Sequence, residues 1–202
     1  MKKYKLTKIT KELPDGTVLH RIEALKDFGC VLKGDKGGFI ESEKNLSHEG
    51  DCWVYKNACV YDKATVTDNA VVWENAQVFG NARVYGNARV YGSAKIYNAA
   101  QVFDNAIILG SSEVYGNARV FGNAMVFGEA SVFNFAVIKE NAKVFDYAQV
   151  FGDTWVRGNV WVYGEARVGG DAVLYGDLRL TDGYFYHTQK KTKEIQKIEI
   201  DE

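Results

Sequence analysis

The chain has 202 residues, of which 25 are Lys or Arg and 26 are Asp or Glu, so its formal net charge at pH 7 is −1. A near-neutral chain of this length fits a single domain and has no strongly basic surface, which argues against nucleic acid or an anionic membrane as a partner. No apolar run follows the N-terminal lysines, so neither a signal peptide nor a transmembrane helix is expected.

Residues 1–41 form the first predicted segment, because they lack the repeat that follows. Residues 4–12 and 17–24 alternate apolar and polar side chains around Pro14-Asp15-Gly16, a strong turn signal, which predicts a β-hairpin. The buried face of this hairpin is expected to carry Leu6, Ile9, Val18 and Ile22.

A glycine-rich loop at residues 33–38 differs from a phosphate-binding loop, because neither a Lys-Ser/Thr pair nor a helix follows it. Its expected role is to deliver Phe39 and Ile40 to the first coil of the repeat. Residues 42–53 then fall into weak register with the repeat, with Gly50 at a turn and two residues at a small inward position, Leu46 and Cys52.

A six-residue phrase repeats through residues 54–179 without insertion or deletion, which gives 21 hexads. The first position is Val, Ile or Leu in every hexad, and the fifth is Ala in 17. Strand alternation places these two positions on the inner face and the sixth and second positions on the outer face. Gly at the third position and Asn at the fourth tolerate the positive φ of a bend. Three bends close a triangle, so 18 residues make one coil and the repeat makes seven, spaced about 4.8 Å apart.

This pattern resembles the hexapeptide-repeat left-handed parallel β-helix family, which includes bacterial acyltransferase-like proteins, and the resemblance covers residues 48–180. It implies an all-β fold, a single-stranded left-handed parallel β-helix of about seven 18-residue coils at residues 42–182. The left hand comes from the resemblance alone. Solenoid ends expose strand edges, so the hairpin at residues 1–41 and a C-terminal tail at residues 183–202 are the expected caps.

Residues 18 apart stack on the same outer face, and the first of the three faces is the most apolar. Exposed apolar columns of this length are rare on soluble monomers. We therefore expect the chain to bind itself, as a dimer or a trimer, through Trp73, Ile107, Leu109, Met125, Phe127 and Trp161.

Three functions fit these observations. The preferred one is a non-catalytic oligomeric scaffold or interaction protein that presents aromatic ladders, because it requires no residue that the chain lacks. Acyl transfer from acyl-CoA is the activity that the resemblance implies, and it requires a histidine base. The three histidines, His20, His48 and His187, all lie outside the hexads, and His48 is the candidate base.

The third alternative is a ligand-binding or sequestering oligomer. In it, a small planar or anionic ligand is clamped between protomers by Arg83, Tyr85, Arg119 and Phe121. No cofactor is predicted, and no metal site is expected, because a zinc lyase centre requires three histidines from adjacent coils. The chain has three cysteines, Cys30, Cys52 and Cys59, which form neither a CxxC pair nor an even set for disulfides. We therefore expect them to be packing residues and the protein to be cytoplasmic.

Overall fold

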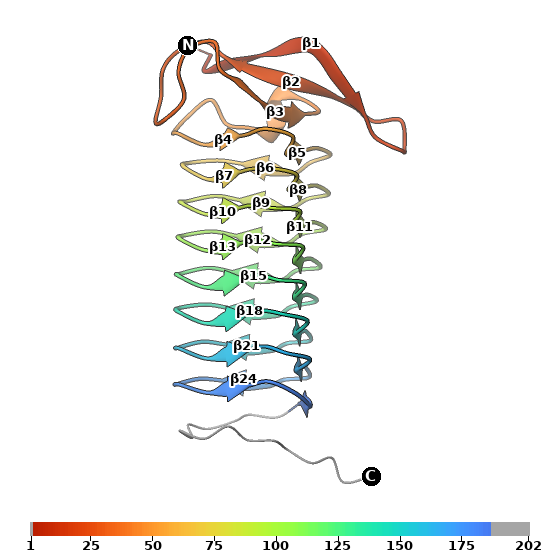
Figure 1. Ribbon diagram of the computed structural model, residues 1–202, viewed down its shortest axis with the longest axis vertical. Helices are drawn as coiled ribbons and strands as arrows, with labels where there is room; N and C mark the ends of the chain where they lie inside the picture. The colour runs from red at the N-terminus through yellow and green to blue at the C-terminus, as the bar shows by residue number, and fades with distance from the viewer. Residues whose placement is uncertain (1, 187–202) are drawn as a thin grey trace.

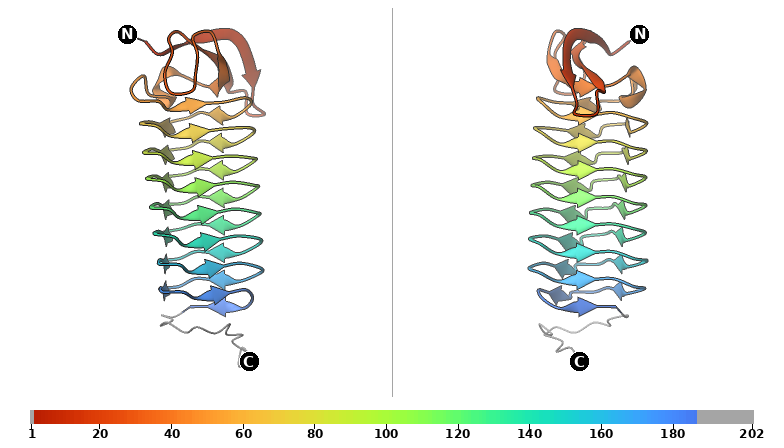
Figure 2. Two further views of the ribbon diagram at one scale, coloured as in Figure 1. Left: turned by 60° about the vertical axis from the view of Figure 1, so that its left-hand side comes forward. Right: turned by 90° about the vertical axis from the view of Figure 1, so that its right-hand side faces the viewer.

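A computed structural model describes residues 2–186 as a solenoid of stacked coils with a β-hairpin across its N-terminal end (Figure 1). Each coil contributes one two-residue strand to each of three sheets, and every strand lies directly beneath its counterpart in the coil before (Figure 2). The fold is therefore the predicted all-β solenoid of parallel strands.

The largest sheet has 11 strands and joins the hairpin to the second face of the solenoid. Its strands pair antiparallel from β1 to β3 and parallel from β3 onward, so the hairpin continues this face. In spatial order they are β1 (Tyr4–Glu12), β2 (Val18–Ala24), β3 (Lys36–Ile40), β5 (Cys59–Val60), β8 (Gln77–Val78), β11 (Lys95–Ile96), β14 (Glu113–Val114), β17 (Ser131–Val132), β20 (Gln149–Val150), β23 (Arg167–Val168) and β26 (Tyr184–Phe185).

The other two sheets are wholly parallel. The first face is the eight-stranded sheet of β4 (Trp53–Val54), β7 (Val71–Val72), β10 (Arg89–Val90), β13 (Ile107–Ile108), β16 (Met125–Val126), β19 (Lys143–Val144), β22 (Trp161–Val162) and β25 (Arg179–Leu180). The third face is the seven-stranded sheet of β6 (Thr65–Val66), β9 (Arg83–Val84), β12 (Gln101–Val102), β15 (Arg119–Val120), β18 (Val137–Ile138), β21 (Trp155–Val156) and β24 (Val173–Leu174).

Pairing within the repeat keeps the predicted spacing of 18 residues, since Arg89 pairs with Val71 in one neighbouring strand and with Ile107 in the other. Seven strands on the third face correspond to the seven predicted coils. Strands β25 and β26 extend the stack into an eighth coil, so the solenoid reaches beyond the predicted boundary at residue 182. The remainder of the predicted tail, residues 187–202 with His187, lies outside the described residues.

The core consists of the first and fifth hexad positions, as predicted. These side chains are buried in every coil, and nearly all of them are fully buried. Two of the exceptions to Ala at the fifth position are hydroxyl residues, and each hydroxyl donates a hydrogen bond to a carbonyl group three residues earlier. Ser112 Oγ donates to the carbonyl of Leu109 at 2.9 Å, and Thr154 Oγ1 donates to that of Phe151 at 2.6 Å. Each polar atom is thus paired inside an otherwise apolar core.

The bends follow a stricter rule than predicted, because positive φ occurs at the third hexad position alone and in all 21 hexads. Nine of these residues are not glycine, and in the six that are Asp or Glu a side-chain hydrogen bond offsets the strain of this conformation. Asp68, for example, accepts a hydrogen bond from the backbone N–H of Gly86, one coil further, at 2.9 Å. The same contact recurs for Asp62, Glu74, Asp104, Glu140 and Asp146.

The hairpin has the predicted strands, but its buried face differs from the prediction. Ile9 is 53% exposed and Val18 is 44% exposed, whereas Ile22 is buried and Leu6 is partly buried. A bulge between Leu6 and Thr10 changes the alternation, and the tip of the hairpin projects past the edge of the coils (Figure 1). The side chains that the hairpin buries fully are Tyr4, Leu19, Ile22 and Ala24.

The open end of the solenoid is closed by two residues whose burial the sequence did not predict. Lys3 is fully buried, and its Nζ donates to the carbonyl oxygens of Cys52 at 2.9 Å and Gly50 at 3.1 Å. Tyr4 donates its hydroxyl proton to the carbonyl of Leu46 at 2.7 Å and packs edge-on against Trp53. The N-terminal strand therefore satisfies carbonyl groups of the first coil.

Register in this first coil corrects one prediction. Leu46 bridges Val66, 20 residues away, and so occupies the aliphatic first position instead of the small fifth one. The short 3-10 helix η1 (Glu43–Asn45) accommodates the two additional residues. Phe39 and Ile40 enter the stack as predicted, through pairing of β3 with β5. Cys52 is buried at its inward position, and Gly50 has the φ of +64° expected of a turn.

Candidate functional site

The first face presents two parallel columns of outward side chains. The leading column is formed by the first residue of each strand: Trp53, Val71, Arg89, Ile107, Met125, Lys143, Trp161 and Arg179. The trailing column is formed by the residue that follows each strand: Tyr55, Trp73, Tyr91, Leu109, Phe127, Phe145, Tyr163 and Thr181. All six residues of the predicted self-association surface lie in these columns and are partly buried, so the structure brings them onto one surface.

The trailing column forms a ridge of stacked rings. Tyr55 stacks on Trp73 with ring centroids 4.7 Å apart, and Phe127 stacks on Phe145 at the same separation. Phe145 also stacks on Tyr163 at 5.0 Å. In-register side chains on neighbouring parallel strands support one another in this way, so the ridge is held rigidly by its own members.

A groove runs beside the leading column from Val71 to Met125, where Val71 and Met125 are smaller than the rings opposite them. Two cavities of about 540 and about 310 Å³ follow one another along it, and both are lined by Arg89. Between Val71 and Met125 the first face therefore has a groove on one side and a ridge on the other.

The outer wall of the groove is a ladder of asparagine side chains at the corner between the third and first faces. Each amide Nδ2 donates to the Oδ1 of the residue one coil further, at 2.9–3.3 Å, through Asn69, Asn87, Asn105, Asn123, Asn141, Asn159 and finally Asp177. Sequence reasoning assigned these asparagines to positive φ and missed the ladder. The signal was present as Asn at intervals of 18 residues.

Lys143 and Arg179 on the first face lie over the ring of Trp161. Lys143 Nζ is 4.7 Å from the ring centroid of Trp161, and the guanidinium of Arg179 lies 4.1 Å from it on the next coil. Among the described residues, Arg89 has neither an ion pair nor a ring contact with its own chain. It stands in the groove as a positive charge that is open to a partner.

The four predicted ligand-binding residues share the third face. Tyr85 stacks on Phe103 at 4.8 Å, and Phe103 stacks on Phe121 at 4.7 Å. The guanidinium of Arg119 lies 5.4 Å from the rings of both Phe103 and Phe121. Arg83 lies two coils before Arg119 in the same sheet. The arrangement is a charged, aromatic surface, and ligand binding there stays a prediction.

His48, the candidate base, lies in the first coil against the N-terminal cap, with its ring stacked 4.4 Å from that of Tyr4. Its Nδ1 is 3.2 Å from the backbone nitrogen of Lys3, which can only donate, so Nδ1 accepts and the neutral ring carries its proton on Nε2. Nε2 lies 3.6 Å from a carboxylate oxygen of Glu43. A hydrogen bond from Lys2 holds the pKa of Glu43 below its usual range. The lone pair that a base requires is thus engaged within the cap.

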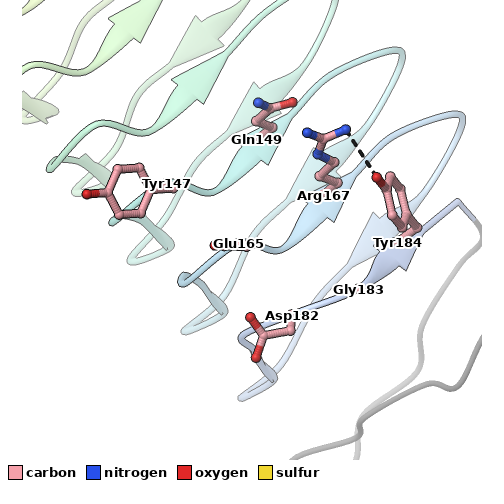
Figure 3. Close-up of a pocket in the computed structure, with 7 residues that line it drawn as sticks. All are labelled: Tyr147, Gln149, Glu165, Arg167, Asp182, Gly183 and Tyr184. Carbon is pink, nitrogen blue, oxygen red and sulfur yellow. Dashed lines mark hydrogen bonds between the residues drawn. The ribbon is translucent and has the colours of Figure 1, made fainter.

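A separate cavity of about 360 Å³ lies near the C-terminal end of the second face and is lined by Tyr147, Gln149, Glu165, Arg167, Asp182, Gly183 and Tyr184 (Figure 3). Arg167 donates to the hydroxyl of Tyr184 at 3.2 Å. The sequence could not predict this cavity, because it depends on a shortened last coil in which Arg167 pairs with Tyr184, 17 residues later. The lining contains two carboxylates, Glu165 and Asp182, and neither a histidine nor a cysteine.

The described part of the chain lacks two other kinds of feature. Residues 2–186 contain no group of three His, Cys, Asp or Glu side chains that could hold a metal ion. They also contain no helix of the length and apolarity that crossing a membrane would require.

Comparison with known proteins agrees with the architecture. A repeat family described as "YdcK Beta solenoid repeat" matches residues 76–92, 82–98 and 113–128. The chain is also 39% identical over 62 residues to a protein of Escherichia coli (strain K12) named "Uncharacterized acetyltransferase YdcK". That alignment covers 27% of this chain and 19% of the relative, so it spans about a fifth of the relative's length. The matched repeats and the stacked parallel coils together fit a hexapeptide-repeat β-helix family.

Proposed function

We propose that this protein is a non-catalytic solenoid scaffold that associates with itself through the first face. The observation that carries the proposal is the ridge and groove of that face, where apolar and aromatic side chains occupy most outward positions of eight consecutive strands. Large apolar surfaces that follow a rigid element mark interaction sites in soluble proteins. The six residues of the predicted surface lie at its centre and towards both ends.

Analytical ultracentrifugation of the wild type and one double variant tests the proposal. Leu109→Glu with Phe127→Lys places two charges at the centre of the first face, and we expect a folded monomer, because an unpaired charge is costly to bury at an interface. The matched control, Tyr115→Glu with Phe133→Lys, makes the same change on the second face, where these rings also stack. This control should still associate. A wild type that sediments as a monomer at micromolar concentration would contradict the proposal.

Acyl transfer is the second candidate function, and the printed name of the E. coli relative is the observation that favours it. Under this alternative the protein binds acetyl-CoA, and His48→Ala abolishes turnover while the fold remains intact. The scaffold proposal predicts no heat of binding when acetyl-CoA is titrated into the wild-type protein in a calorimeter. Saturable binding would favour the transferase, because fold alone does not decide between the two functions.

A further inference from the structure

We propose that two copies of the chain pair through their first faces side by side and pointing the same way, with a two-fold axis parallel to the solenoid. This inference rests on the self-association proposed above and adds the partner's orientation. It follows from the asymmetry of the face, which has the ridge of the trailing column on one side and the groove beside the leading column on the other.

A two-fold axis relates two identical faces in one of two ways. When the axis runs along the solenoid, the left and right sides of the face exchange, and the ridge of each copy enters the groove of the other. When the axis runs across the solenoid, the sides do not exchange, so ridge meets ridge and groove meets groove. Shifting one copy along the long axis of the solenoid does not alter this mismatch. Close packing at an interface therefore selects the parallel pair.

The spacing between coils favours a second copy of the chain as the partner that binds in the groove. Stacked rings of the ridge have centroids 4.7–5.0 Å apart, Trp73 and Tyr91 are 6.4 Å apart, and Leu109 stands between Tyr91 and Phe127. The backbone of both the ridge and the groove repeats at the coil spacing. Two identical solenoids stay in phase over every coil. In the parallel pair each leading residue faces the trailing residue of the same coil, so Ile107 meets the partner's Leu109 and Met125 meets the partner's Phe127.

The charges select the same orientation. In the parallel pair Arg89, which has no ion pair or ring contact among the described residues of its own chain, faces the partner's Tyr91, and Lys143 faces the partner's Phe145. Both contacts place a cation against an aromatic ring. In the antiparallel pair, centred between β13 and β16, Arg89 faces the partner's Lys143. Two like charges then meet across the interface, which is unfavourable.

Cross-linking between differently tagged protomers tests the orientation. We use the full chain with Cys30→Ser, which removes the exposed thiol and leaves only the buried Cys52 and Cys59. Protomers with Ile107→Cys are mixed with protomers carrying Leu109→Cys, or with protomers carrying Met125→Cys, and treated with a short bis-maleimide. Separate protomers are necessary, because residues 107 and 125 are neighbours within one chain.

The parallel pair predicts a cross-linked heterodimer from the first mixture and none from the second. The reverse result would overturn the orientation while leaving self-association intact. A wild type that sediments as a monomer would instead overturn the proposed function itself. A trimer would overturn the two-fold pairing and keep the interface.

A charge reversal supplies an independent readout in solution. Arg89→Glu places a carboxylate against the partner's Tyr91 in the parallel pair, and we expect the dissociation constant to rise about tenfold, since each dimer loses two cation–aromatic contacts. In the antiparallel pair the same glutamate would face the partner's Lys143, and association would tighten. Sedimentation equilibrium distinguishes the two results by their sign.

Discussion

The ammonium nitrogen of Lys3 lies 2.9 Å from the carbonyl oxygen of Cys52, in a side chain with no solvent exposure. The same nitrogen reaches the carbonyl of Gly50 at 3.1 Å and lies 4.9 Å from the ring centroid of Phe28. A buried charge persists only where acceptors replace its water. Lys3 therefore supplies hydrogen-bond donors to an end of the solenoid that the repeat itself leaves open.

Removing this ammonium group should destabilise the protein. Lys3→Met keeps the aliphatic stem but leaves the carbonyl oxygens of Gly50 and Cys52 without their donor, at an expected cost of about 1–3 kcal/mol. Lys8→Met, at an exposed position of β1, the strand that follows Lys3, should change stability by less than about 0.5 kcal/mol. Urea unfolding measures both, and equal midpoints would show that the buried contact does not stabilise the cap.

Overpacking the crowded inner corner should also destabilise the protein. Ala118 is fully buried, so Ala118→Leu should cost about 1–3 kcal/mol by forcing the neighbouring coils apart. Arg119→Leu, at the adjacent outward position, should have a mild effect. Urea midpoints compare the two variants, and similar destabilisation by both would contradict the inward assignment of the fifth position.

Interrupting the asparagine ladder should lower the stability of the protein measurably, although the ladder is exposed to solvent. Asn105 both accepts from Asn87 and donates to Asn123, so Asn105→Ala removes two hydrogen bonds and should cost about 1 kcal/mol. Asn117 occupies the fourth position at another corner, outside the ladder, and Asn117→Ala should be nearly neutral. Thermal unfolding compares the two. A neutral Asn105→Ala would mean that the ladder contributes no net stability.

Alkaline pH should weaken the contact between the hairpin and the second face. Burial beneath the hairpin raises the pKa of Tyr61 to about 12, because it disfavours the phenolate. The stability gained from the neutral ring is therefore complete below the unfolded pKa of about 10, and is lost as the pH rises towards about 12. Tyr61→Phe should reduce this loss in denaturant titrations at increasing pH. Tyr147→Phe, at an exposed site, should leave it unchanged.

The ligand-binding alternative predicts a bound molecule on the third face. If it holds, native mass spectrometry of the purified protein will show an additional anionic or planar species, and Arg83→Gln with Arg119→Gln will remove it. Lys95→Gln on the second face is the matched control and should retain it. The scaffold proposal predicts the mass of the chain or its oligomer alone.

The repeat and the hairpin strands could be predicted from sequence because both depend on local rules. Alternation and a fixed period place Val and Ala inside, and Pro14-Asp15-Gly16 forces a turn, whatever the rest of the chain does. The same reasoning put all six residues of the first face on one surface. It did not separate the ridge from the groove, although the signal is present in the sequence, where the residue that follows each strand of this face is mostly aromatic.

The junctions could not be predicted, since there the chain meets parts of itself that are distant in sequence. Burial of Lys3 depends on carbonyl groups of residues 50 and 52. The register of Leu46 is set by η1. Ile9 is exposed because of the bulge in β1 and because the tip of the hairpin extends past the coils. The ladder could have been found by asking which polar residues recur at intervals of 18 instead of six.

The carboxylates that brace the bends limit how this solenoid can change its length. At the corner that precedes the first face, Asp68, Asp104 and Glu140 alternate with Gly86, Gly122 and Gly158, each acid accepting the N–H of the glycine one coil further. Successive acids are thus two coils apart, about 9.6 Å at the usual strand spacing, which is close to the screening length in physiological salt. Deleting one coil would place two acids on neighbouring coils, whereas deleting two coils would preserve the alternation of acid and glycine. At this corner the backbone repeats every coil, but the carboxylates repeat every second coil, so growth or shortening of the solenoid between residues 68 and 158 should proceed by coils in pairs.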